Sequence, residues 1–202
     1  MDLSTIFNTV TTQLADQQTA LNQADEHNHD HGDHMVQIFN LIQGAVSQKE
    51  NLPVPEQLKF ASQVVAKEAD SGSAKLYAQG LANAAKTFSD KDLQPDTLGL
   101  LIKSLMNVED PPQEQPKPSL LKSLLSGLGG KSNAAEKDQK VDFDDVLRAG
   151  MAFYQAKQDG DSTSEALVGA LMASSPLGQS KHRAMSGALV ASTIMDFAKS
   201  AK

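Results

Sequence analysis

The chain of 202 residues contains no cysteine and no tryptophan, and aromatic residues make up only 4% of it. Without cysteine, the protein has no disulfide, no thiolate nucleophile and no sulfur ligand for zinc or an iron–sulfur cluster. Any metal must therefore be bound by carboxylate, imidazole or amide groups. This restricts the possible chemistry to hard cations or to metals that accept histidine.

Basic residues are also in deficit, since 18 Lys and Arg stand against 25 Asp and Glu, a formal net charge of −7. Proteins that bind a phosphate backbone need a basic face, so we expect no nucleic-acid partner. No apolar run approaches the ~18 residues of a membrane span, and Met1 to Ser4 lack the features of a secretory signal. We therefore expect no membrane partner and a cytoplasmic location.

The spacing of apolar residues predicts an all-α fold, with roughly seven or eight helices in a single domain over residues 1–202. Helix-favouring residues recur at intervals of three and four, whereas strand-like alternation is scarce. Segments 109–118 and 131–140 have the Pro-rich and polar composition of linkers, which predicts an inserted loop at about 109–140. The expected helices cover residues from Asp2 or Ser4 to 21, 35–46, 56–69, 74–88, 98–106, 141–158 and 163–171, and a last one begins at about 183. Residues 119–128 are expected to form a short amphipathic segment docked on the surface within the inserted loop.

Four of the five histidines lie in the stretch from Asp25 to His34, which is almost free of apolar residues. This composition predicts a loop rather than a buried helical turn. The pairs Asp25/His29 and Asp30/His34 are four residues apart, and imidazole favours Zn²⁺ or Ni²⁺, so a transition-metal site is one hypothesis. A solvated polar loop is the alternative. The remaining histidine, His182, is interpreted as a surface or capping residue.

Four segments resemble, in the same order, the motifs of the DhaL-like domain, the nucleotide-binding part of dihydroxyacetone kinases. They are Asp30-His31-Gly32-Asp33-His34-Met35, Asp70-Ser71-Gly72-Ser73-Ala74-Lys75-Leu76-Tyr77-Ala78, Gly160-Asp161-Ser162-Thr163, and Leu177-Gly178 followed by Ser186-Gly187-Ala188. The resemblance implies a closed bundle of about eight antiparallel helices, with ADP or ATP bound at one rim. It also implies Mg²⁺ ions that bridge loop carboxylates and phosphate oxygens.

The resemblance assigns metal-binding and phosphate-binding roles to separate sets of residues. Asp30, with Asn28 and with Asp25 or Asp33, would bind Mg²⁺. His31, Gly72, Ser73, Gly160 and Thr163 would lie near the phosphates of the nucleotide.

The acidic motif departs from the family pattern. In the register that keeps Asp30-His31-Gly32, the two preceding family carboxylates fall on Gln23 and Asn28, which are neutral. In a second register Asp25 and Asp30 are the first two carboxylates and Asp33 is a displaced third. Amide oxygens are weaker ligands than carboxylates, so the number of metals or the nucleotide affinity should fall in the first register.

The first functional hypothesis is therefore phosphoryl transfer of the dihydroxyacetone kinase type, with a separate substrate-binding subunit that holds the ketone. A second hypothesis is a catalytically inactive DhaL-like binding or regulatory module with a protein partner. A third is a transition-metal-binding helical protein that uses His29 and His34.

Overall fold

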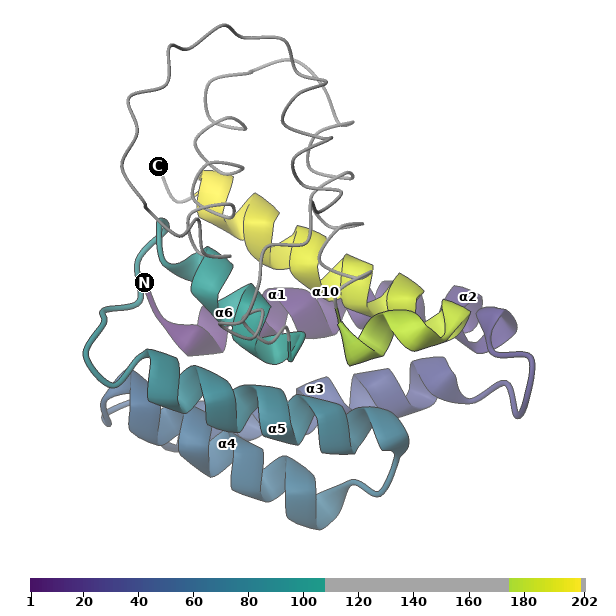
Figure 1. The fold of residues 1–202 in the computed structure, drawn as a ribbon, viewed down its shortest axis with the longest axis horizontal. Helices are drawn as coiled ribbons and strands as arrows, with labels where there is room; N and C mark the ends of the chain where they lie inside the picture. Colours follow the sequence, from purple (N-terminus) through teal and green to yellow (C-terminus); the bar gives the residue numbers. More distant parts are fainter. Residues whose placement is uncertain (108–174, 201–202) are drawn as a thin grey trace, which may run out of the picture.

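The computed structural model describes residues 1–107 and 175–200, and within these ranges it contains seven α-helices, one 3₁₀ helix and no strand. The prediction of an all-α fold is confirmed for this part of the chain. In chain order (Figure 1), the elements are α1 (Leu3–Asp16), α2 (Gln18–Ala24), α3 (His31–Gln48), α4 (Val54–Glu68), α5 (Gly72–Thr87), α6 (Leu98–Leu105), η1 (Pro176–Gln179) and α10 (Lys181–Ser200).

Several helix starts follow directly from local sequence. The Asp2 carboxylate accepts a hydrogen bond from the Thr5 amide at 2.7 Å and so caps α1. The Ser71 hydroxyl accepts one from the Ala74 amide at 3.0 Å and caps α5. Helix α4 begins at Val54 rather than at the expected 56, because a proline such as Pro55 is tolerated in a first helical turn, where its missing N–H has no partner.

The His-rich stretch is only partly a loop. Residues 25–30 lie outside the helices, but α3 begins at His31, whose side chain is buried. The expectation that no part of 25–34 forms a buried helical turn is therefore wrong. The cause is Asn22 of α2, whose Oδ1 accepts hydrogen bonds from the amides of Gly32 at 2.6 Å and Asp33 at 3.2 Å and caps α3 from a different helix.

Two other boundaries also differ from the sequence prediction. The expected first helix is divided at Gln17 into α1 and α2, and the last helix begins at Lys181 rather than at about 183. The expected helices at 141–158 and 163–171 lie outside the described residues, as does the inserted loop at 109–140 with its amphipathic segment at 119–128.

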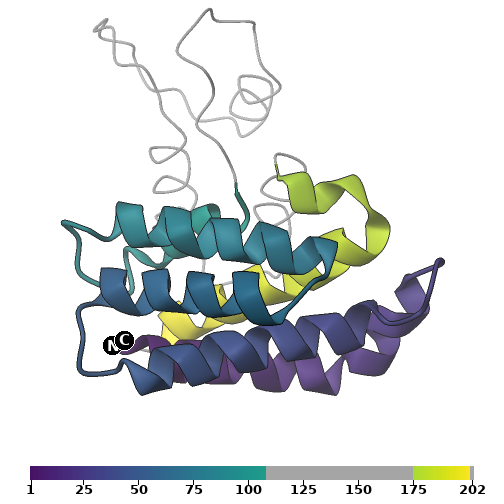
Figure 2. The same cartoon turned by 90° about the horizontal axis from the view of Figure 1, so that it is seen from below.

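The helices pack around one core in an up-and-down order. Each of α1, α3, α4, α5, α6 and α10 contacts the next in this order, and α10 contacts α1 in turn, so the contacts close into a ring. Fully buried side chains fill the interior, among them Ile6, Phe7, Phe39, Leu58, Tyr77 and Ile194. The N-termini of α3, α5 and α10 lie at the same end of this bundle, as Figures 1 and 2 show.

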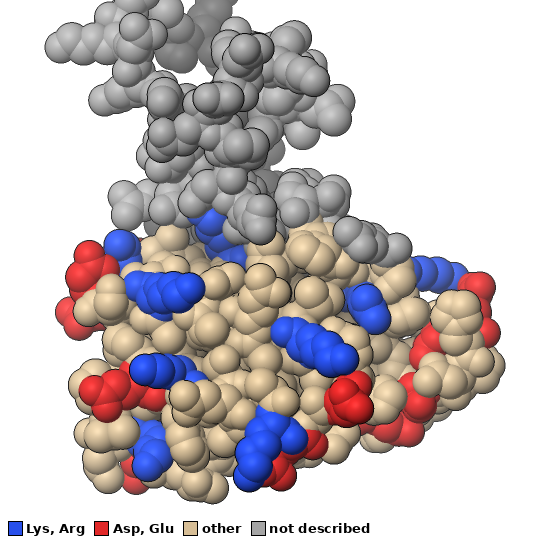
Figure 3. Space-filling model, turned by 60° about the horizontal axis from the view of Figure 1, so that its bottom comes forward, with Lys and Arg blue, Asp and Glu red and all other residues tan. Residues whose placement is uncertain are grey.

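Charged side chains of both signs are mixed on the face of the molecule that Figure 3 shows, with uncharged side chains among them. None of the helices in residues 1–107 and 175–200 is long and apolar enough to cross a membrane.

Candidate functional site

A cavity of about 450 Å³ lies where the N-termini of α3, α5 and α10 meet. It is lined by Asp25, His27, Asn28, Asp30, His31, His34, Ser71, Gly72, Ser73, Ser180, His182 and Arg183. These residues come from the loop before α3 and its first turn, from the start of α5 and from the start of α10. Almost every lining residue is polar, so the cavity is suited to a polar or charged ligand.

Helix N-termini supply free amide donors and a partial positive charge. The first amides of α3 are already capped by Asn22. At the start of α5, the amides of Gly72 and Ser73 have no acceptor in the described part of the chain. Helix α5 has 16 residues and α10 has 20, so both are long enough to carry a full helix dipole.

Arg183 extends from α10 to the first residue of α5. A Cβ atom built on Gly72 would lie 2.5 Å from Nη2 of Arg183, so the guanidinium rests directly on the Cα atom of this glycine. The Nε atom of Arg183 is buried and has no hydrogen-bond partner, and the side chain forms no ion pair within residues 1–107 and 175–200. A buried cationic donor without a partner is unusual in a folded protein.

Ser73 adds a second donor without a partner. Its side chain is only 3% exposed, yet it lines the cavity. Its hydroxyl forms no hydrogen bond with any other described residue. Ser73 therefore presents a free donor and acceptor to the cavity.

A chain of hydrogen bonds ties α3 to α10 beside this cavity. The Ser186 hydroxyl donates to the Arg183 carbonyl oxygen at 3.1 Å and lies 2.9 Å from Nε2 of His31. The Ser186 hydroxyl therefore links the first turn of α10 to the His31 ring of α3. The His31 and His182 rings lie 4.6 Å apart between centroids, and Nδ1 of His182 is 3.7 Å from Oδ1 of Asp25.

The environment sets the charges of Asp25 and His31, the buried titratable residues that line the cavity. Burial, the neighbouring His182 and Arg183 lower the pKa of His31 to about 4, against the opposing effect of Asp25, so the ring is neutral at pH 7. Desolvation raises the pKa of Asp25, but the His27 amide at 3.1 Å and the neighbouring histidines outweigh it and bring the pKa below its ordinary value. Asp25 is therefore a carboxylate at neutral pH.

The acidic residues do not form a ready-made metal site. Asp30 lies 3.2 Å from Nδ1 of His34, and Asp25 faces His182. Asp33 accepts hydrogen bonds from Gln18 at 2.6 Å and Asn22 at 3.0 Å and does not line the cavity. Within the described residues, no group of three His, Cys, Asp or Glu side chains could hold a metal ion.

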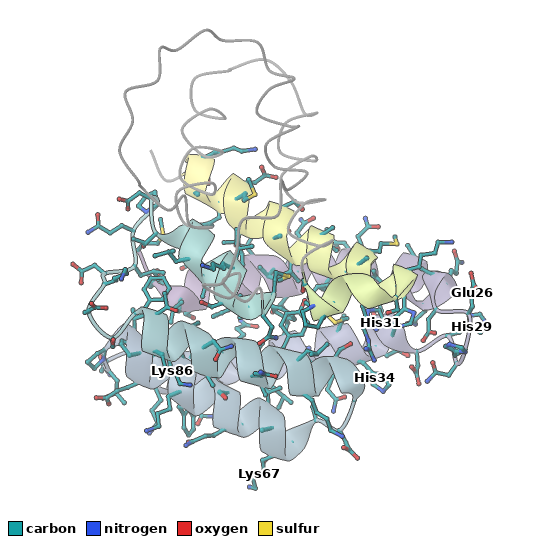
Figure 4. The ribbon with its side chains drawn as sticks, in the orientation of Figure 1. Glu26, His29, His31, His34, Lys67 and Lys86 are labelled. Carbon is teal, nitrogen blue, oxygen red and sulfur yellow. The ribbon has the colours of Figure 1, made fainter. Side chains whose placement is uncertain are left out.

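The two histidines of the transition-metal hypothesis lie apart. Figure 4 shows His34 with His31 near the starts of α5 and α10, while His29 and Glu26 lie at the outer tip of the loop. Of these four residues, His31 and His34 line the cavity. A metal in this cavity would therefore depend on Asp25, Asn28 and Asp30 together with atoms of a ligand.

The cavity thus brings together most of the site residues expected from sequence and adds others. Asp25, Asn28, Asp30, His31, Gly72 and Ser73 line it, whereas Gly160 and Thr163 lie outside the described residues. Sequence reasoning missed Arg183, and it assigned His182 only to the surface or to a helix cap, whereas the structure places this ring in the cavity wall beside His31.

A local signal for these two residues exists. The first turn of α10 contains Lys181, His182 and Arg183 and no acidic residue. Positive side chains at this end of a helix are repelled by the partial positive charge of the helix dipole. Basic residues at a helix N-terminus are unfavourable unless an anion offsets them, so such a cluster can indicate a binding site.

Comparisons of the chain with protein-family models, with curated proteins and with solved structures gave no match.

Proposed function

We propose that the cavity binds the phosphate groups of ADP or ATP, and that the chain is a DhaL-like nucleotide-binding domain in phosphoryl transfer of the dihydroxyacetone kinase type. The observation that carries this proposal is the meeting of three helix N-termini with the unpartnered side chains of Arg183 and Ser73. Free amides, a guanidinium and a hydroxyl are the donors that phosphate oxygens accept.

The spatial arrangement of the motifs supports the resemblance. Segments 30–35 and 70–78 are far apart in sequence, yet Asp30, His31, Gly72 and Ser73 line one cavity. The ring of contacts from α1 to α10 is also in keeping with a closed bundle. The resemblance also assigns Gly160 and Thr163, which lie outside the described residues, to the phosphates of the nucleotide.

Magnesium fits this cavity as a partner of the nucleotide rather than as a resident ion. The oxygens of Asp25, Asn28 and Asp30 line the cavity but make up only part of an octahedral shell. Phosphate oxygens would supply further ligands, and the ion would offset phosphate charge. We therefore expect Mg²⁺ and ADP to bind together, with little binding of Mg²⁺ alone.

The proposed reaction also needs a phosphate acceptor and a protein that holds it. The resemblance assigns this role to a separate substrate-binding subunit of the dihydroxyacetone kinase type. The DhaL-like chain would then supply the nucleotide, and its partner would supply the ketone or its phosphorylated form.

Calorimetric titration with ADP in the presence of Mg²⁺ tests this proposal. We expect binding that weakens at least tenfold in Asp30→Ala, because this substitution removes a cavity carboxylate. Glu26→Ala is the matched control, since Glu26 is an acidic residue of the same loop but lies outside the cavity. The proposal is rejected if the native protein gives no Mg²⁺-dependent heat, or if the two substitutions have the same effect.

A further inference from the structure

The same cavity contains a set of donors that needs no metal. Arg183 reaches Gly72 at the start of α5, where the free amides of Gly72 and Ser73 and the unpartnered Ser73 hydroxyl are also found. We infer that Arg183, Ser73 and the first amides of α5 bind a phosphoryl group directly, without a divalent metal. The inference rests on the proposed nucleotide site but makes a separate claim, because it replaces a bridging metal with a protein cation for at least one phosphate.

The donors at the start of α5 have a geometry that suits phosphate. A planar guanidinium presents several N–H groups in a fixed fork that matches phosphate oxygens. The fork lies against the N-terminal turn of a helix of 16 residues, so charge and dipole act on the same point. Only a glycine at position 72 leaves room for this approach, because a Cβ atom there would lie 2.5 Å from Nη2.

The guanidinium of Arg183 has no carboxylate counter-ion within the described residues. The carboxylates that line the cavity are engaged elsewhere, Asp25 with the His27 amide and His182, and Asp30 with His34. Neither forms an ion pair with Arg183 in the part of the chain that the structure describes. A bound anion would give the guanidinium and the Ser73 hydroxyl the partners that these groups lack.

The first turn of α10, which carries Arg183, is held in place by hydrogen bonds within the protein. The Arg183 carbonyl accepts a hydrogen bond from Ser186, whose hydroxyl oxygen also lies 2.9 Å from Nε2 of His31 of α3. This chain holds the first turn of α10 against α3 before any ligand arrives. A cation held in place by supporting hydrogen bonds loses less entropy when it binds an anion.

Titration of the full chain with inorganic pyrophosphate in EDTA tests the inference, because no divalent metal is then available. We expect saturable binding that weakens at least tenfold in Arg183→Gln and several-fold in Arg183→Lys, which keeps the charge but loses the fork. Lys181→Gln is the matched control. Lys181 lies in the same helical turn, is exposed and is absent from the cavity wall, so its loss should change affinity less than twofold.

Gly72→Ala is a second, independent variant that changes no charge. Its methyl group displaces the flexible end of Arg183 rather than the backbone, so the fold should survive, which a melting curve verifies. We expect at least a fivefold loss of pyrophosphate affinity. Native-like affinity in both Gly72→Ala and Arg183→Gln would overturn the inference.

The outcomes separate this inference from the nucleotide proposal. If ADP binds only with Mg²⁺, and Arg183→Gln and Lys181→Gln weaken binding equally, the inference fails and the proposed function stands. If pyrophosphate binds in EDTA through Arg183 while Mg²⁺ adds nothing to ADP binding, the inference stands and the Mg²⁺–nucleotide proposal fails. If neither compound binds, both fail.

Discussion

At the scale of single residues, the buried ring of His31 makes stability depend on pH. In the folded protein its pKa is about 4, whereas an unfolded histidine titrates near 6.5. Between these values the unfolded chain binds more protons than the native one, so the free energy of unfolding falls as the pH drops from about 6.5 to 4. Above and below this pH range, His31 does not contribute to the pH dependence of the unfolding free energy.

We predict that His31 accounts for a loss of about 1 to 2 kcal/mol in unfolding free energy between pH 7 and pH 5. Urea denaturation of the metal-free protein at both pH values measures the loss, and His31→Gln should remove most of it. The groups that face the ring, His34, His182, Arg183 and Asp25, remain in the variant. Equal pH slopes in the two proteins would contradict the assignment.

At the scale of elements, the start of α3 depends on a cap that α2 supplies. We predict that Asn22→Ala lowers the unfolding free energy by about 1 to 2 kcal/mol, because it leaves the Gly32 and Asp33 amides without an acceptor. Gln23→Ala is the control, since Gln23 is an exposed neighbour on the same helix. Chemical denaturation followed by circular dichroism measures both, and a loss of equal size in the control would refute the role of Asn22.

Helices with local signals were predictable, and helix ends set by distant residues were not. The expected segments 56–69 and 98–106 match α4 and α6 to within about two residues, because prolines and apolar periodicity mark them. The break at Gln17 carries no Pro or Gly signal, and the apolar stripe of α1 continues to Leu21. The extension of α3 to His31 depends on Asn22, a contact between helices that no local pattern reports.

At the scale of the whole molecule, the cavity exists because α10 returns to helices near the start of the chain. Motif resemblance alone placed Asp30 near Gly72 and Ser73, and the structure brings all three to one cavity. The approach of Arg183 to Gly72 was not predictable from the sequence. It depends on how α10 packs against α3, against the η1 segment and against α6, which in turn contacts α5. In the sequence, the cluster of basic residues at the start of α10 is the one local feature that indicates this contact.

Because α10 contacts α1, α2, α3 and α6, its burial should be coupled to the folding of the whole bundle. We predict that Ile194→Ala, a change at a fully buried position of α10, lowers the unfolding free energy by about 2 to 4 kcal/mol. Leu58→Ala, at a buried position of α4, should lower the unfolding free energy by a similar amount.

Urea unfolding followed by both circular dichroism and tyrosine fluorescence measures this coupling in a Tyr154→Phe background, where Tyr77 is the remaining tyrosine and reports on the core that α5 shares with α3. Met185→Ala is the control, because Met185 lies on α10 but is 43% exposed. The two signals should coincide in every variant. If Ile194→Ala instead produces an early transition that leaves the Tyr77 signal unchanged, α10 unfolds independently, and a cavity that needs Arg183 would open with it.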